Sequence, residues 1–459
     1  EIPMGSVIDV LVDIASTPAI LVALIALIGL LVQRKPASDI VKGTLKTFVG
    51  FLVLSGGAGV VSASLAPFGD MFKAAFNVKG VVPNNEAIVA MALDEYGTAT
   101  ALIMFFGMLV NILIARFTKF KHIFLTGHHT LYMAAMLAVI FAVAGFSGAS
   151  LILTGSLALG AVMSLSPYFL QRYMREMTGN DGVGLGHFGG GGYWMAGAIG
   201  SLLRGKKEKV TTTEEVNFPK SLAFLRDSTV SISITMMIVY LIVAIFAGPS
   251  FFAENYPEEG NFVIFALTLA GQFAAGVFII LAGVRLILNE IVPAFKGISE
   301  KLVPNAIPAL DCPIVFPFAP NAVLIGFLSS FVGGIVSMPI MALAGLPIVI
   351  PGVVPHFFCG ATAGVFGNSR DGLRGAVVGA FVQGNAISFL PLALAPALGD
   401  LGSASSTFSD FDFTIMGIYF GNLGGSFGQI GAIAGLVVLY GAMIAYSIFK
   451  KAPKAAVAA

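Results

Sequence analysis

Long apolar stretches separated by short polar segments recur along the whole chain. A helix that spans a bilayer needs about 20 mostly apolar residues. Eleven such stretches are present, at 12–32, 45–65, 96–115, 123–146, 149–170, 228–248, 262–284, 321–345, 347–368, 373–397 and 427–449. The longest polar stretch, 204–227, is too short to hold a soluble catalytic domain. The pattern predicts an all-α polytopic membrane protein with about eleven transmembrane helices.

Composition leads to the same class of protein. Hydrophobic residues make up 57% of the chain and charged residues 11%, whereas soluble domains carry roughly 25% charged residues. A net charge of +1 excludes a strongly basic nucleic-acid-binding face. Cys312 and Cys359 have no metal-ligand spacing, so we expect two membrane-buried thiols, with no metal site and no cofactor.

The distribution of Lys and Arg predicts the orientation of the helices, because short cytoplasmic loops are rich in basic residues. Basic clusters occur at 34–46, 116–121, 172–175, 204–209, 285–301, 370–374 and 450–454. Eleven crossings with the N-terminus outside and the C-terminus in the cytoplasm put all of them inside. The same arrangement places Glu254–Glu259, Asp400, Asp410 and Asp412 outside, and Lys73 and Lys79 are exceptions.

Two sequence matches indicate an internal repeat. Val82-Pro83-Asn84 recurs as Val303-Pro304-Asn305, 221 positions later, and Gly186–Gly190 resembles Gly421–Gly425, 235 positions later. Five predicted crossings separate the first pair, so the two halves would run through the membrane in opposite directions. We therefore predict the inverted repeat that many transporters share.

Three segments break the helical pattern at membrane depth, where irregular backbone is tolerated only inside protein or beside a wet cavity. They are Thr178–Tyr193, Ser405–Gly425 and Pro304–Pro320, the last with five prolines. We predict two re-entrant hairpins from the first two segments. The third is predicted to be a broken helix, because proline removes a helical hydrogen bond. The tips of all three would meet near the midplane.

Ionisable residues inside membrane segments are costly and usually mark function. His128, His187, Asp311 and Glu86 occupy such positions and suit the binding of a hydroxylated solute through hydrogen bonds. Structural alternatives remain for each of them. His128 or His129 could be solvated at the interface, His187 could cap a helix, Asp311 could cap the eighth crossing, and Glu86 could lie at the outer interface.

Four motifs carry a resemblance to a known family. KGTLKTFVGF (42–51), FLTGHH (124–129), FKGISEKLVPNAIPALDC (295–312) and FAPNAVLIGF (318–327) resemble the membrane component, enzyme IIC, of the L-ascorbate phosphotransferase system. The similarity runs from about residue 40 to residue 450. It implies a homodimer in the bacterial inner membrane, elevator-type movement, and uptake of L-ascorbate coupled to phosphorylation by cytoplasmic IIB and IIA partners.

The resemblance also implies a core domain and a V-shaped scaffold domain. The scaffold would comprise 1–80 and 228–302. The core would comprise 81–203 with the first hairpin and 303–426 with the second. The remaining segments are a cytoplasmic loop at 204–227, and a last helix with a cytoplasmic tail at 427–459.

Carried over onto this sequence, the solute-binding residues of the family fall at seven positions: Asn85, Glu86, His128, Tyr132, His187, Phe188 and Asp311. The two histidines and Asp311 match the family pattern. The family has a Thr-Tyr pair at Asn85-Glu86 and glutamines at Tyr132 and Phe188. Because an added carboxylate disfavours an anion such as ascorbate, a related sugar acid, a sugar or a polyol is a further possibility.

The resemblance implies a transport subunit rather than an enzyme, since separate chains supply the phosphoryl group. The competing hypothesis is a proton- or ion-coupled secondary transporter that uses His128, Asp311 and Glu86 as coupling groups. No pattern resembles a channel filter, and no nucleophile–base spacing indicates an integral membrane enzyme.

Overall fold

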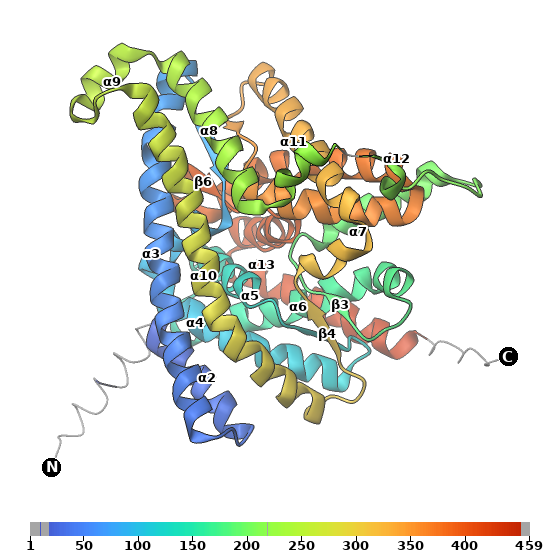
Figure 1. Cartoon of the computed structure of the whole chain (residues 1–459). Helices are drawn as coiled ribbons and strands as arrows, with labels where there is room; N and C mark the ends of the chain where they lie inside the picture. The colour runs from blue at the N-terminus through green and yellow to red at the C-terminus, as the bar shows by residue number, and fades with distance from the viewer. Residues whose placement is uncertain (1–9, 11–17, 218, 451–459) are drawn as a thin grey trace.

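Helices make up most of the computed structural model, which describes residues 10, 18–217 and 219–450 (Figure 1). The helices are α2 (Pro18–Val32), α3 (Ala37–Phe76), α4 (Asn85–Phe117), α5 (Gly127–Val143), α6 (Gly148–Thr178), α7 (Gly190–Arg204), α8 (Ser228–Ala247), α9 (Pro249–Asn255), α10 (Phe262–Leu302), α11 (Pro320–Leu343), α12 (Val353–Leu394) and α13 (Phe411–Phe449). The strands are β1 (Gly80–Pro83), β2 (His122–Phe124), β3 (Gly184–Leu185), β4 (Ile307–Leu310), β5 (Ile348–Val349) and β6 (Ser406–Thr407).

Within the described residues, eight helices are long and apolar enough to cross a membrane. The predicted class, an all-helical polytopic membrane protein, is therefore confirmed. The eight do not correspond one to one to the eleven predicted crossings. α2 and α5 are shorter, at 15 and 17 residues, and the first residues of the predicted crossing 12–32 lie outside the described part. The predicted crossings 347–368 and 373–397 both belong to α12.

α12 folds back on itself as a helical hairpin. Asp371 and Gly372 leave helical geometry, and Gly372 has a φ of 61° and a ψ of −142°, a conformation that side-chain-bearing residues rarely adopt. Ser330 of α11 lies between the two arms. Its hydroxyl donates to Gln383 Oε1 at 2.9 Å and lies 2.7 Å from His356 Nδ1. These bonds attach both arms to α11.

The predicted irregular segments differ in outcome. Pro304–Pro320 is irregular, as predicted: it contains β4 and a 3₁₀ helix at Cys312–Phe318. Thr178–Tyr193 contains β3 and the first turn of α7. The hairpin predicted over Ser405–Gly425 is wrong, because β6 is followed there by uninterrupted helix, the first arm of α13. The helix bends only later, at Gly428, whose φ is 61°.

Six short parallel strands connect distant parts of the chain in two small sheets. Their orders are β5-β1-β6 and β2-β4-β3. In each sheet the middle strand comes from one half of the sequence and both outer strands come from the other half. Because parallel strands end at the same edge, the residues that follow β2, β3 and β4 are brought together.

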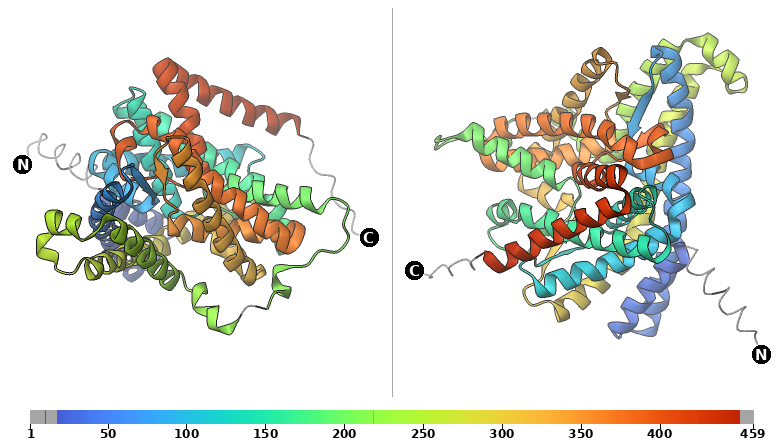
Figure 2. Two further views of the ribbon diagram at one scale, coloured as in Figure 1. Left: turned by 90° about the horizontal axis from the view of Figure 1, so that it is seen from above. Right: turned by 180° about the vertical axis from the view of Figure 1, so that it is seen from behind.

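The helices form two groups. α2, α3, α8 and α10 lie together along one side of the molecule, where α3 and α10 run side by side for most of their 40 and 41 residues (Figures 1 and 2). The rings of Phe68 and Tyr240 join α3 to α8 at a centroid distance of 4.6 Å. The remaining helices, α4 to α7 and α11 to α13, make up the body that carries the site described below.

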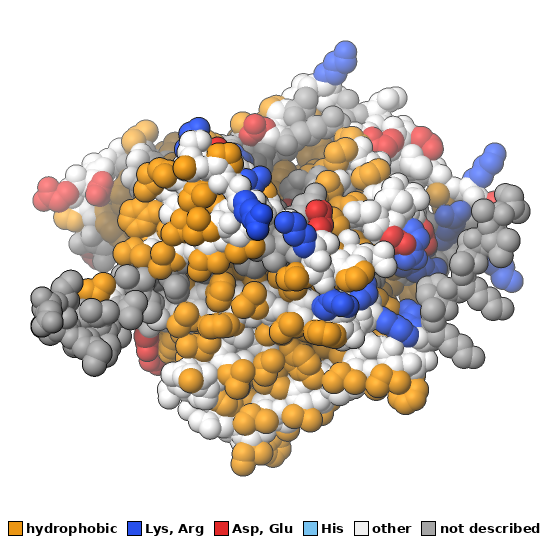
Figure 3. All heavy atoms as spheres, turned by 90° about the horizontal axis from the view of Figure 1, so that it is seen from below, with side chains coloured by type: hydrophobic (Ala, Val, Ile, Leu, Met, Phe, Trp, Pro, Cys, Tyr) orange, Lys and Arg blue, Asp and Glu red, His pale blue; other side chains and the backbone are white. Residues whose placement is uncertain are grey.

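The surface is unusually apolar, which fits a lipid environment. Leu343 is 90% exposed and Phe449 is 81% exposed. In Figure 3, hydrophobic side chains cover broad areas of one face, and Lys and Arg side chains gather in a band across it. A soluble protein rarely exposes contiguous apolar areas of this extent.

Candidate functional site

Three histidines and two aspartates converge from separate segments into one histidine–aspartate cluster. His128 and His129 belong to the first turn of α5, His187 lies between β3 and α7, Asp311 follows β4, and Asp410 follows β6. His128 Nε2 and His187 Nε2 lie 3.7 Å and 4.0 Å from the Asp311 carboxylate. His129 Nε2 and His187 Nε2 lie 3.7 Å and 4.0 Å from Asp410 Oδ2. These separations are too long for direct hydrogen bonds, so a solute hydroxyl that lies beside a facing N–H and carboxylate can bond to both.

Backbone hydrogen bonds determine which nitrogen of two of these histidines carries the proton. The Phe188 N–H donates to His129 Nδ1 at 3.0 Å, and the Gly189 N–H donates to His187 Nδ1 at 3.2 Å. A neutral imidazole that accepts at Nδ1 carries its proton at Nε2. Both Nε2–H groups therefore face the carboxylates as donors. N–H donors opposite carboxylate acceptors suit a sugar hydroxyl, which both accepts and donates.

The loop that carries His187 is held in place by Asp412. The Asp412 carboxylate accepts from Ser166 Oγ at 2.6 Å and from the Gly191 N–H at 2.8 Å, and its own N–H donates to Phe188 O at 2.8 Å. A Cβ at Gly190 or Gly191 would meet this carboxylate. The glycine run is therefore needed for α7 to start this close to α13, which fixes the position of His187.

Asp410 is positioned by a second set of hydrogen bonds. Its Oδ1 accepts from Asn85 Nδ2 at 2.9 Å and from Ser409 Oγ at 2.7 Å. Asn85 Oδ1 in turn accepts from the Ser409 N–H at 3.0 Å. Asn85 thus supports Asp410, whose other oxygen is left to face the histidines.

Glu86 lies beside this network and is 7% exposed. Its Oε2 has no hydrogen-bond partner, and it is close enough to Asp410 for their charges to interact. Glu86 is therefore enclosed by protein beside the cluster.

The two aromatic candidates lie at the cluster in different ways. Tyr132 is 1% exposed, its hydroxyl has no hydrogen-bond partner, and its ring centroid lies 5.8 Å from that of His128. Phe188 stacks on Phe124 at 4.4 Å, so its side chain forms a wall and only its backbone N–H reaches a histidine. Tyr132 is thus the only one of the two whose side chain has a polar group available for a solute.

The structural alternatives for His128 and Asp311 are also resolved by the geometry. The His128 side chain is 12% exposed, so it is not a solvated interfacial group. Asp311 does cap the 3₁₀ helix, since its Oδ1 accepts from the Cys312 N–H at 2.7 Å, while its Oδ2 faces His128. Capping and facing the cluster are thus compatible for Asp311.

Sequence reasoning missed Asp410 and gave too little weight to His129. The charge distribution groups Asp410 and Asp412 with the residues outside the membrane, whereas the structure buries both in the protein, at 2% and 9% exposure. Both belong to the segment Ser405–Gly425, which was itself expected at membrane depth. The reasoning that marked Asp311 as functional applies equally to Asp410, and that was the available signal.

The cluster was also considered as a metal site, since His129, His187 and Asp410 offer ligand atoms within 4.8 Å of one another. A metal needs an unprotonated ring nitrogen, but the lone pairs of His129 and His187 are at Nδ1 and already accept backbone N–H groups. The arrangement fits a hydroxyl ligand better. Cys312 and Cys359 are buried free thiols, as predicted.

Comparison with known proteins agrees with this picture. A family model described as "PTS system sugar-specific permease component" matches residues 13–412. The chain is also 28% identical over 414 residues to the "Ascorbate-specific PTS system EIIC component" of Mycoplasma pneumoniae, an alignment that covers 79% of this chain and 62% of that protein. Less than two thirds of that relative is therefore matched. The resemblance to phosphotransferase enzyme IIC is confirmed, and the chain belongs to the EIIC-GAT family of sugar-specific permease components.

Proposed function

We propose that this chain binds a small polyhydroxylated solute in the histidine–aspartate cluster and carries it across the bacterial inner membrane while cytoplasmic IIB and IIA partners phosphorylate it. The observation that carries the proposal is the pairing of two fixed Nε2–H donors with the carboxylates of Asp311 and Asp410. This chain supplies binding and transport, and the phosphoryl chemistry resides on the partners.

The first substrate to consider is L-ascorbate or a related sugar acid. The resemblance in the sequence motifs supports it, and so does the ascorbate-specific name of the Mycoplasma relative. Ascorbate carries several hydroxyl groups on a small ring, which matches a cluster that alternates donors and acceptors. The proposed site residues are Asn85, Glu86, His128, Tyr132, His187, Phe188 and Asp311, with His129 and Asp410 added.

A neutral sugar or polyol is the second candidate, and Glu86 is the observation that favours it. In the described part of the chain, the salt-bridge partners of Asp311 and Asp410 are histidines rather than Lys or Arg. An anion about 5 Å from one carboxylate is disfavoured by about 3 kcal/mol at an effective dielectric constant of about 20. A neutral polyol avoids this cost.

The two candidates are separated by a binding panel on the detergent-purified chain. Thermal shift and equilibrium binding would be measured with L-ascorbate, sugar acids, hexoses and polyols, for wild type and for Glu86→Gln. At a pH where Glu86 is ionised, removing its carboxylate strengthens binding of an anion by about tenfold or more and leaves a neutral polyol nearly unchanged. Glu95→Gln, an exposed carboxylate on the same helix, is the matched control. If His187→Ala affected no ligand in the panel, the cluster would not be the binding site.

Several architectural features belong to the same proposal. We propose that α2, α3 and α8 to α10 form the scaffold of a homodimer and that α4 to α7 and α11 to α13 form the moving core of an elevator. An inverted repeat is supported by the spacing of the strands. The first residues of β4, β5 and β6 follow those of β1, β2 and β3 by 222 to 227 positions. The Val-Pro-Asn match, at 221 positions, falls near this spacing.

The N-out, C-in orientation remains part of the proposal, and contacts between basic segments support it. Arg370 forms a 2.7 Å salt bridge with Glu176, and Arg204 donates to the Arg370 carbonyl at 3.3 Å. The segments 172–175, 204–209 and 370–374 therefore lie on one side of the protein, as the positive-inside rule requires of cytoplasmic loops.

A further inference from the structure

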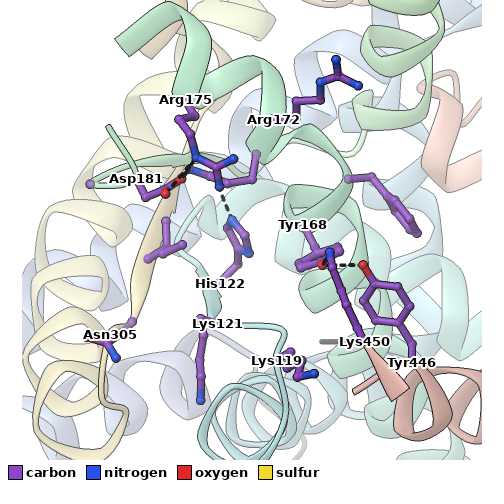
Figure 4. A pocket seen from close by; sticks show the side chains of 15 residues that line it. Lys119, Lys121, His122, Tyr168, Arg172, Arg175, Asp181, Asn305, Tyr446 and Lys450 are labelled. Atoms are coloured by element: carbon purple, nitrogen blue, oxygen red, sulfur yellow. Dashed lines mark hydrogen bonds and ion pairs between the residues drawn. The ribbon is translucent and has the colours of Figure 1, made fainter. Parts of the chain in front are cut away.

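A cavity of about 1040 Å³ lies apart from the histidine–aspartate cluster (Figure 4). Its walls come from the segment before β2, the C-terminal half of α6, the loop before β3, the turn before β4 and the end of α13. None of the seven solute-site residues carried over from the family lines it. The cavity is large enough for a sugar-sized molecule with its hydration water.

The lining of this cavity is strongly basic. Its Lys and Arg side chains outnumber its carboxylates by five to one: Lys119, Lys121, Arg172, Arg175 and Lys450 against Asp181. Arg175 is neutralised by Asp181, with Nε–oxygen distances of 2.8 and 2.9 Å. Arg172 Nε lies 3.4 Å from Glu176 Oε1, and the three lysines leave an excess of positive charge around one hollow. An anion is the ligand that this excess attracts.

The positive-inside rule explains why Lys and Arg occur in these loops, but not how they are arranged. Lys450 Nζ donates to Tyr168 Oη at 2.7 Å and lies 5.3 and 4.9 Å from the ring centroids of Tyr168 and Tyr446. Lys121 Nζ donates to the Ala115 carbonyl at 2.8 Å. Neither ammonium group is paired with a carboxylate in the described part of the chain. These cations are held at the cavity rather than scattered in solvent.

His122, which lines the cavity, has a buried ring nitrogen without a partner. Gln171 Nε2 donates to Asp181 Oδ1 at 3.1 Å and to Val183 O at 3.3 Å, so Gln171 Oε1 accepts from His122 Nε2 at 2.9 Å. His122 is 2% exposed, and its Nδ1, then an acceptor, has no hydrogen-bond partner. Burial also lowers the pKa of His122 to about 4, so the ring is neutral. The neutral His122 ring is therefore an uncharged part of the cavity wall beside the cations.

The cavity and the cluster lie at opposite ends of the sheet β2-β4-β3. His122 and Ile307 pair at the first position of β2 and β4 and both line the cavity, whereas Asp311 follows the last residue of β4 and belongs to the cluster. Four residues of extended chain span about 13 Å. A molecule released from the cluster therefore has a basic hollow one short strand away.

We propose that this cavity binds a small phosphate monoester, the phosphorylated form of the carried solute, after phosphoryl transfer. The phosphate group lies between the ammonium groups of Lys119 and Lys450, and Lys121 and Arg172 add to the positive charge of the wall. The role assigned to the cavity rests on the proposed function, because phosphorylation is what produces such an ester. Binding to the cavity can be tested without transport.

Isothermal titration of the full-length purified chain with inorganic phosphate, a hexose 6-phosphate and the unphosphorylated hexose tests the proposal. Both phosphates bind, the hexose 6-phosphate more tightly, and the free hexose does not bind at this cavity. Lys119→Gln/Lys450→Gln weakens binding of the ester by about tenfold or more for each cation lost. Tyr168→Phe, which removes the hydroxyl that holds Lys450, weakens it less. Lys207→Gln/Lys209→Gln, which removes two exposed cations elsewhere, has no effect.

Three results would overturn the proposal: no measurable binding of either phosphate, equal weakening by both double variants, or loss of ester binding in phosphatidylglycerol but not phosphatidylcholine nanodiscs. The last would identify a lipid headgroup as the occupant. His187→Ala separates this proposal from the proposed function. It retains ester binding if the cavity is correct, whether or not the cluster binds the solute.

Discussion

Asp410 offers the sharpest test of the cluster, because its two oxygens have different partners. Oδ1 is held by Asn85 and Ser409, and Oδ2 faces His129 and His187 at 3.7 and 4.0 Å. In Asp410→Asn the side-chain carbonyl can keep the Oδ1 bonds, while an NH₂ group replaces Oδ2. That NH₂ group faces two Nε2–H donors and cannot accept from a solute hydroxyl.

The expected loss follows from the charge of the missing acceptor. A hydrogen bond to a charged group contributes about 1.5–3 kcal/mol. Asp410→Asn should therefore weaken solute binding by roughly 10- to 150-fold. The loss of stability should be small, since the supporting bonds of Oδ1 remain and the volume of the side chain is unchanged.

Equilibrium binding of the best ligand from the panel, together with thermal unfolding, measures both quantities. Asp412→Asn is the matched control, because Asp412 is buried two residues away but bonds Ser166 and the Gly191 backbone. It should lower the unfolding temperature more than it lowers affinity. Equal loss of affinity in both variants, or a loss confined to stability in Asp410→Asn, would refute the role given to Oδ2.

Two further predictions concern stability. Burial lowers the pKa of His122 to about 4, from about 6.5 in the unfolded chain. The folded state is therefore at its full stability above pH 6.5, and it loses stability as the pH falls towards 4, because the unfolded chain takes up the proton first. Thermal unfolding between pH 7 and 4 should show on the order of 3 kcal/mol of destabilisation that His122→Phe lacks, and parallel curves would contradict this. Gly372→Ala should destabilise the chain by about 2 kcal/mol or more, because its φ is 61° and a Cβ would meet the Thr211 carbonyl. Gly425→Ala, where a Cβ meets nothing within 4 Å, should unfold at or above the wild-type temperature. Equal unfolding temperatures for the two variants would contradict the claim that the turn at Gly372 requires glycine.

Much of the site could be predicted from the sequence. His128, His187 and Asp311 stand out because ionisable groups are rare in apolar segments, and the structure brings all three into the cluster. The prolines of Pro304–Pro320 correctly indicated irregular backbone. The family was predicted from four motifs, and the match over residues 13–412 confirms it.

The rest depends on contacts that local patterns do not contain. Strands of two to four residues, such as β3 and β6, are too short for an alternating pattern, and they pair with partners more than 120 positions away. Asp410 is held by Asn85, 325 positions away in the sequence, a contact that no local pattern predicts. Gly372 reverses the chain within α12, between the two apolar stretches that the sequence predicts as separate crossings.

Phosphorylation-coupled uptake is tested most directly in proteoliposomes that contain the purified chain and enclose its cytoplasmic phosphotransferase partners. With phosphoenolpyruvate inside, radiolabelled solute should accumulate as a phosphate ester. Accumulation should need both phosphoenolpyruvate and an intact His187, and it should be insensitive to a proton ionophore. Accumulation of unmodified solute driven by a proton gradient, without phosphoenolpyruvate, would contradict the proposed function and identify a secondary transporter.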